Sequence, residues 1–127
     1  MAEIRILYAE DNEQVRKMFG MLIAHSLREH NLSIDTCENG RELLEKADPS
    51  RYHIYVTDHN MPEVTGLEAI KELRKRGDQT PALLISGGID NLLEYQTLER
   101  VAYLAKPPLI NDLSSTLKKL LNGHLNN

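Results

Sequence analysis

The chain has 127 residues, of which 41% are hydrophobic and 27% charged, so its size and composition indicate one globular domain with its own core. Its formal net charge of −4, without a run of lysine and arginine, argues against direct binding to nucleic acid. No stretch of about 20 apolar residues predicts a membrane helix. The single cysteine, Cys37, excludes an internal disulfide, and we expect a cytoplasmic protein that does not contact membranes.

Apolar runs and helical patterns alternate along the first half of the chain. After Asn12, which is placed to cap a helix, apolar residues recur every three or four positions. Alternation of apolar and polar residues at 32–37 is typical of a strand near the edge of a sheet. The expected elements are a strand at 4–9, a helix at about 13–29, a strand at 32–37, a short helix at 41–47 and a buried strand at 54–58.

The second half continues the alternation. Met61-Pro62 and Gly66 interrupt the apolar run that ends at Asp58 and lead into a helix with a charged outer face. The following apolar run is short and β-rich, which indicates a fully buried strand. The expected elements are a helix from about Thr65 to Gly77, a strand at 81–86, a more polar helix at 90–99, a strand at 101–105 and a last helix from about Asn111 that ends near Gly123.

Five strands and five helices are thus expected in alternation. This order favours an α/β fold, in which a doubly wound parallel sheet is flanked by helices on both faces. No linker or repeat interrupts the pattern. We therefore expect a single domain over residues 1–127, with its core at about residues 3–122 and no output domain.

Charged side chains follow three of the predicted strands at the point where each strand ends. Glu10 and Asp11 follow the first strand, Asp58 ends the third, and Lys106 follows the last. Because the carboxyl ends of parallel strands meet at one edge of a sheet, we expect these side chains to converge. Two carboxylates 4 Å apart repel by roughly 4 kcal/mol at an effective dielectric constant of ~20, which favours a cation between them. An all-oxygen site suits a hard cation such as Mg²⁺.

The same edge has the groups that phosphoryl transfer requires. Lys106 supplies a fixed positive charge, and Ser86 places a hydroxyl donor at the end of the neighbouring strand. Together with a metal ion, these groups would stabilise negative charge on a transferred phosphoryl group. We therefore expect Asp58 to act as the nucleophile and to form an aspartyl phosphate.

Several segments resemble the receiver domains of two-component response regulators, and the resemblance covers nearly the whole chain. These segments are Tyr8-Ala9-Glu10-Asp11-Asn12, Asn39-Gly40-Arg41-Glu42-Leu43-Leu44, the run from Asp58 to Gly66, Leu84-Ile85-Ser86-Gly87 and Tyr103-Leu104-Ala105-Lys106-Pro107. The resemblance implies a flavodoxin-like sheet with the strand order 2-1-3-4-5. It also implies a phosphorelay signalling switch, which catalyses only its own phosphorylation and dephosphorylation and is not an enzyme for a separate substrate.

The resemblance assigns a role to each acidic residue. Asp58 would accept the phosphoryl group from a histidine kinase or a histidine phosphotransfer protein. Mg²⁺ would be bound by Asp11, Asp58 and the backbone carbonyl of Asn60, while Glu10 would act through a bound water molecule. Glu10 stands where aspartate is often found in the family, and the water would accommodate its extra methylene group.

The resemblance also implies how the site reports its state. Ser86 and Lys106 would bind the phosphoryl oxygens, and the Lys106-Pro107 peptide bond would be cis. Tyr103 would be the switch aromatic, turning inward as Ser86 moves toward the phosphate, although a tyrosine in a strand is also typical of ordinary packing. A downstream protein would bind residues 90–121, and we expect a monomer or a weak dimer.

Three other functions fit the pattern less well. A pseudo-receiver, which binds proteins without phosphorylation, would typically have lost part of a set that is complete here: Glu10, Asp11, Asp58, Ser86 and Lys106. A phosphohydrolase of the haloacid dehalogenase type needs a second acid two residues after the nucleophile, where this chain has asparagine. A dinucleotide-binding domain needs a Gly-x-Gly-x-x-Gly segment after the first strand, and this chain has none there.

Overall fold

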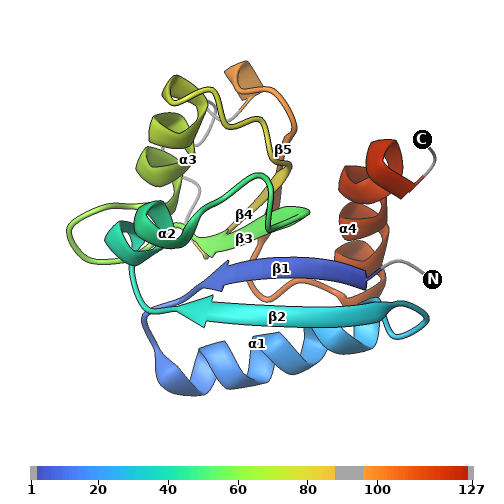
Figure 1. Cartoon of the computed structure of the whole chain (residues 1–127). Coiled ribbons are helices and arrows are strands. Elements are labelled where there is room, and N and C mark those ends of the chain that lie inside the picture. The colour runs from blue at the N-terminus through green and yellow to red at the C-terminus, as the bar shows by residue number, and fades with distance from the viewer. Residues whose placement is uncertain (1–2, 88–95, 126–127) are drawn as a thin grey trace.

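The computed structural model describes residues 3–87 and 96–125 as alternating strands and helices (Figure 1). The elements are β1 (Glu3–Ala9), α1 (Glu13–Ser26), β2 (Asn31–Cys37), α2 (Gly40–Lys46), β3 (Ile54–Asp58), α3 (Gly66–Lys75), β4 (Ala82–Ser86), β5 (Val101–Ala105) and α4 (Ile110–Leu125). The five strands form one parallel sheet in the order β2-β1-β3-β4-β5. The predicted doubly wound α/β fold and its strand order are therefore confirmed.

Helices cover both faces of the sheet (Figure 1). On one face, α2 and α3 bury side chains such as Leu43 and Ile70 against the sheet. On the other face, α1 and α4 bury Ile23 and Leu117 in a second apolar cluster. β3 and β4 are buried along their whole length because both of their faces are covered and both of their edges are paired. The carboxyl ends of the central strands are therefore held by two cores at once.

Side-chain caps set the start of the helices that follow the functional loops. The Oδ1 of Asn12 accepts a hydrogen bond from the backbone N–H of Val15, as predicted, so that α1 begins directly after the first acidic pair. Thr65 and Glu68 form a reciprocal capping box at the start of α3. The caps fix where the loops after β1 and β3 end, and both loops lie at the same edge of the sheet because the two strands are parallel.

The described residues contain four of the five expected helices. Most of the predicted helix at 90–99 falls on residues 88–95, which lie outside the described residues. The part of that segment that is described, residues 96–100, forms a short 3₁₀ turn and a bend, so the described chain has four helices, not five. No helix in the described part of the chain is both long enough and apolar enough to cross a bilayer.

Two helix ends also differ from the prediction. α1 ends at Ser26, before the expected end at 29, because Leu27 leaves the helical conformation with φ −120° and ψ 29°. α4 begins at Ile110 and continues through Gly123 to Leu125. A glycine ends a helix only where the backbone turns to the left-handed region, and the backbone at Gly123 stays helical.

Candidate phosphoacceptor site

Three acidic side chains meet at the carboxyl edge of the sheet. One carboxylate oxygen from each of Glu10, Asp11 and Asp58 lies within 4.8 Å of the other two. Glu10 and Asp58 are buried, whereas Asp11 is exposed. The cluster therefore combines buried negative charge with one side open to solvent.

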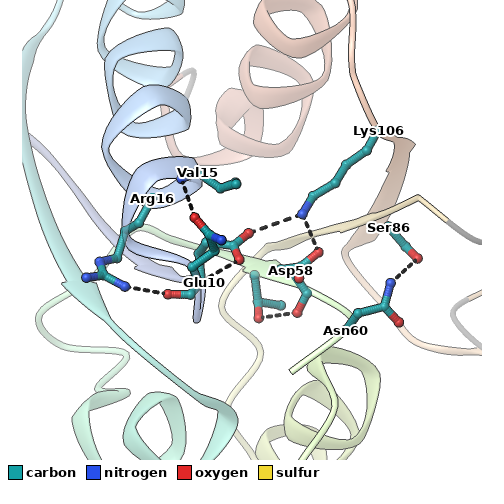
Figure 2. A network of polar contacts seen from close by, with 9 residues as sticks. Glu10, Val15, Arg16, Asp58, Asn60, Ser86 and Lys106 are labelled. Carbon is teal, nitrogen blue, oxygen red and sulfur yellow. Dashed lines mark hydrogen bonds and ion pairs between the residues drawn. The ribbon is translucent and has the colours of Figure 1, made fainter. Parts of the chain in front are cut away.

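Lys106 supplies the opposite charge. Its Nζ lies 3.1 Å from the Oε1 of Glu10 and 2.9 Å from the Oδ1 of Asp58. Figure 2 shows the side chain reaching from the end of β5 to both carboxylates. The Lys106-Pro107 peptide bond is cis, as the resemblance implied. Burial disfavours the ammonium, but the contacts with Asp58 and Glu10 outweigh it and raise the pKa of Lys106.

The loop after β1 holds Glu10 in place. Its Oε2 accepts a hydrogen bond from the backbone N–H of Asn12 at 3.1 Å, and its backbone carbonyl accepts one from the Arg16 guanidinium at 2.8 Å (Figure 2). Burial raises the pKa of Glu10, and the negative charge of Asp58 adds to that effect, while the Asn12 N–H and Lys106 oppose it. Glu10 is therefore a carboxylate whose proton is held more tightly than usual.

The backbone around Asp58 is fixed from both sides. The Thr57 hydroxyl donates a hydrogen bond to the Asp58 carbonyl at 2.9 Å. On the other side, a Cβ atom at Gly66 would lie 2.3 Å from that carbonyl oxygen, so only glycine lets α3 start so close to the end of β3. The neighbouring His59 faces α3, where its Nδ1 accepts a long hydrogen bond of 3.4 Å from Leu67.

Ser86 and Tyr103 lie at the other end of the site. Ser86 is fully buried, and its hydroxyl accepts a long hydrogen bond of 3.5 Å from the side-chain amide of Asn60. The backbone carbonyl of Ser86 accepts hydrogen bonds from the Tyr103 hydroxyl at 3.2 Å and from the Lys106 backbone N–H at 2.9 Å. A movement of Ser86 would therefore be transmitted to Tyr103 and Lys106, at the end of β5, through two hydrogen bonds.

The structure thus brings together most of the residues that the sequence singled out. Glu10, Asp11, Asp58 and Lys106 form one cluster, and Ser86 joins it through Asn60. The roles assigned to them, and the use of the Asn60 backbone carbonyl as a metal ligand, stay predictions.

Sequence reasoning missed the supporting contacts of three residues at the site. Arg16, Thr57 and Gly66 each contact the backbone of a cluster residue or leave room for it. Gly66 was part of the recognised motif, but its close approach to Asp58 is a long-range contact. A signal for Arg16 was its position one turn into α1, on the side that faces the loop after β1.

The donor set fits a hard divalent cation. It consists of carboxylate oxygens. The Oδ1 of Asp58 is buried and makes the ion pair with Lys106, but within the described residues it accepts no hydrogen bond of good geometry. Mg²⁺ prefers oxygen ligands and keeps part of its water shell, which the exposed side of Asp11 permits. A metal ion and Lys106 together would balance the charge of three carboxylates.

A family model described as response regulator receiver domain matches residues 6–118. Among curated proteins, the chain is 30% identical to the response regulator MprA of Mycolicibacterium vanbaalenii, over 93% of this chain and 50% of the relative. It is 32% identical to a protein-glutamate methylesterase/protein-glutamine glutaminase of Archaeoglobus fulgidus, over 93% of this chain and 34% of the relative. The chain thus spans between about a third and half of the length of these relatives.

A solved structure gives the same result for the fold. The response regulator protein TrrA of Thermotoga maritima, in complex with Mg²⁺-BeF, superposes with a TM-score of 0.76 at 29% sequence identity. The superposition covers 93% of this chain and 99% of TrrA.

Proposed function

Because the chain belongs to the family of response regulator receiver domains, we propose that it takes part in phosphorelay signalling by accepting a phosphoryl group on Asp58. The observation that carries the proposal is the contact of the Lys106 ammonium with the buried Asp58 carboxylate, beside two further acids. Receiver domains interact with histidine kinases or phosphotransfer proteins, and such a protein would be the phosphoryl donor.

Asp58 is the nucleophile of the proposed step. One of its carboxylate oxygens attacks the phosphorus of a phosphohistidine, so that a P–O bond forms as the P–N bond breaks and the released imidazole nitrogen takes up a proton. Lys106 then exchanges its contact with the carboxylate for one with a phosphoryl oxygen. The Ser86 hydroxyl donates a hydrogen bond to a second phosphoryl oxygen.

We propose that Mg²⁺ is the cofactor of this site. Asp11, Asp58 and the backbone carbonyl of Asn60 would bind it, with Glu10 acting through a water molecule. When bound, the ion would supply positive charge to the phosphoryl oxygens. The proximity of the three carboxylates supports this assignment, as does the Mg²⁺-BeF complex of TrrA.

The proposed output runs through Ser86 and Tyr103. Phosphorylation would draw the Ser86 hydroxyl toward the phosphate, and the Ser86 carbonyl that Tyr103 contacts would move with it. Tyr103 would then reposition on β5, next to α4. A downstream protein would read this change on residues 90–121, of which 90–95 lie outside the described part of the chain.

Acetyl phosphate with Mg²⁺ tests the proposal directly. Intact-mass analysis is expected to show the gain of one phosphoryl group in the wild type and in Asp35→Asn, and no gain in Asp58→Asn. Asp35 is a suitable control because it lies on β2 and pairs with Arg51 and Tyr52, outside the acidic cluster. Modification of Asp58→Asn would show that the nucleophile is wrong, and an unmodified wild type that binds no BeF would favour the pseudo-receiver alternative.

A further inference from the structure

A cavity lies at the opposite edge of the sheet from Asp58. Its volume is about 770 Å³, and its lining includes Arg5 near the start of β1, Pro81 before β4 and Arg100 before β5. Lys119 on α4 also lines it. A cavity of roughly 300–1,000 Å³ is the usual size for a small-molecule site. The proposed phosphorelay chemistry makes no use of this cavity.

The charge of the cavity lining has one sign. Arg5, Arg100 and Lys119 line it, and no aspartate or glutamate does, although the chain as a whole carries a formal net charge of −4. Within the described residues, Arg100 and Lys119 make no ion pair, and the nearest carboxylate oxygen of Glu3 lies 3.8 Å from Arg5. Arg100 and Lys119 therefore line the same cavity without a carboxylate partner among the described residues, and Arg5 has only the Glu3 contact, so an anion bound there would be stabilised.

The fold orients the guanidinium of Arg5 and fixes the backbone of Arg100. The Arg5 Nε donates a hydrogen bond to the Arg51 carbonyl, which orients the guanidinium. Arg100 has a φ of 59°, in the left-handed region that favours glycine, and its carbonyl accepts a hydrogen bond of 2.9 Å from the Ala82 N–H. Arg74 braces the same turn through the Glu99 carbonyl at 3.0 Å. Arg100 thus occupies a left-handed backbone position that glycine would adopt with less strain.

The rest of the lining is apolar or uncharged. Pro49, Pro81 and Leu120 provide apolar lining, and Thr80 is among the uncharged polar residues of the lining. A ligand that suits both parts needs a negatively charged group at one end and a flat, weakly polar group at the other. Inorganic phosphate meets only the first requirement, whereas a nucleotide meets both.

We propose that this cavity binds a nucleotide, with its phosphates between Arg5, Arg100 and Lys119 and its base against the proline and leucine side chains. The site is separate from the acidic cluster. His53, which lines the cavity, directly precedes β3, and Asp58 lies at the other end of the same strand. We therefore expect nucleotide binding to take place without the proposed phosphorylation.

The test is a titration of the ¹⁵N-labelled chain with ADP, inorganic phosphate or adenosine, followed by NMR in the presence of EDTA. ADP is expected to shift the amide signals of Arg5, Gln79 and Lys119 saturably. Loss of one charged contact, in Lys119→Gln, is expected to weaken ADP binding about tenfold. Lys118→Gln is the matched control, because the neighbouring Lys118 pairs with Glu29 at 2.9 Å and does not line the cavity.

Two further variants make the result decisive. Arg100→Gly suits the left-handed backbone and is expected to fold well while losing ADP binding. Asp58→Asn is expected to bind ADP as the wild type does, which separates this site from the phosphoacceptor. Absence of saturable shifts at millimolar ADP, equal affinity for inorganic phosphate, or unchanged binding in Lys119→Gln and Arg100→Gly would each overturn the proposal.

Discussion

The Nζ of Lys106 lies 2.9 Å from the Oδ1 of Asp58, and this ion pair joins the end of β5 to the end of β3. Only 4% of the Asp58 side chain is exposed, compared with 29% of the lysine side chain. Water can solvate the charge of Lys106 in part, whereas the buried Asp58 carboxylate has little contact with water. The carboxylate therefore depends more strongly on the ion pair than the ammonium does. The same lysine contacts Glu10, so one cation compensates in part for the charge of two buried acids.

Lys106→Met is expected to destabilise the protein without metal. The change leaves two buried carboxylates without a counter-charge, which we expect to lower the free energy of unfolding by about 1–3 kcal/mol in EDTA. Saturating Mg²⁺ should recover more stability in the variant than in the wild type, because the ion replaces the missing charge. Urea denaturation with and without Mg²⁺ measures both effects.

The control for this change is Lys17→Met. Lys17 makes an exposed i,i+4 pair with Glu13 at 3.8 Å, and such pairs contribute at most about 0.5 kcal/mol. A Lys106→Met variant as stable in EDTA as Lys17→Met would contradict the role of Lys106 as the counter-charge.

As the pH is lowered, the affinity for Mg²⁺ is expected to begin to fall at a higher pH than it would at a site whose carboxylates have ordinary pKa values. Burial raises the pKa of Glu10 above its usual 4.5. Protonated Glu10 therefore contributes to the stability of the folded protein at low pH, and this stability is lost as the pH rises through the raised pKa. The metal needs the ionised form. Protons therefore compete with Mg²⁺ as the pH falls through a window that begins above 4.5.

Mg²⁺ titrations monitored by NMR between about pH 7.5 and pH 5 measure this dependence. Glu10→Gln removes the titrating group, so its Mg²⁺ affinity should be weaker at neutral pH but flatter across the range. The account of Glu10 fails if the wild type and Glu10→Gln show the same slope.

Gly66→Ala is expected to disturb the phosphoacceptor loop. The added Cβ would lie 2.3 Å from the Asp58 carbonyl and 2.9 Å from the Leu84 Cδ1, so the start of α3 must move away from β3. Overpacking of this kind costs about 1–3 kcal/mol. Urea denaturation measures the loss, and the gain of mass with acetyl phosphate reports whether Asp58 still reacts.

Gly20→Ala is the matched control, since a Cβ at Gly20 meets nothing within 4 Å. Gly20 lies inside α1, where alanine is the better helix former by about 0.5–1 kcal/mol, so this variant should be more stable than the wild type. If both alanine variants changed stability in the same direction, the close approach at Gly66 would not be the cause.

Much of the fold followed from local patterns in the sequence. The alternation at 32–37 predicted an edge strand, and β2 lies at the edge; Asn12 and Thr65 were predicted at helix starts, and both cap one. The early end of α1 did not follow, because the apolar stripe continues to Leu27, a buried residue that packs in the core without being helical.

The residues of the site could be predicted from where the strands end, but the contacts that hold them in place could not. The convergence of Asp58 and Lys106 needs only the rule that parallel strands end at one edge. The hydrogen bond from Arg16 to the Glu10 carbonyl and the left-handed backbone of Arg100 depend on how a helix and a turn pack in three dimensions. Neither leaves a pattern of period two or 3.6 in the sequence, so neither was predicted.

Tyr103→Phe is expected to separate phosphoryl binding from output. The Tyr103 hydroxyl donates a hydrogen bond to the Ser86 carbonyl at 3.2 Å, and its loss leaves the acidic cluster and Lys106 unchanged. The variant should therefore bind BeF with Mg²⁺ at wild-type affinity, while the amide shifts that binding causes in β5 and α4 become smaller. NMR spectra of both proteins with and without BeF measure the difference. Ser86→Ala is the contrasting variant, because it removes the hydroxyl that we propose as a donor to the phosphoryl group and should weaken BeF binding itself. Undiminished shifts in β5 and α4 of Tyr103→Phe would mean that the signal leaves Ser86 by another route, such as its 2.9 Å hydrogen bond from the Lys106 N–H.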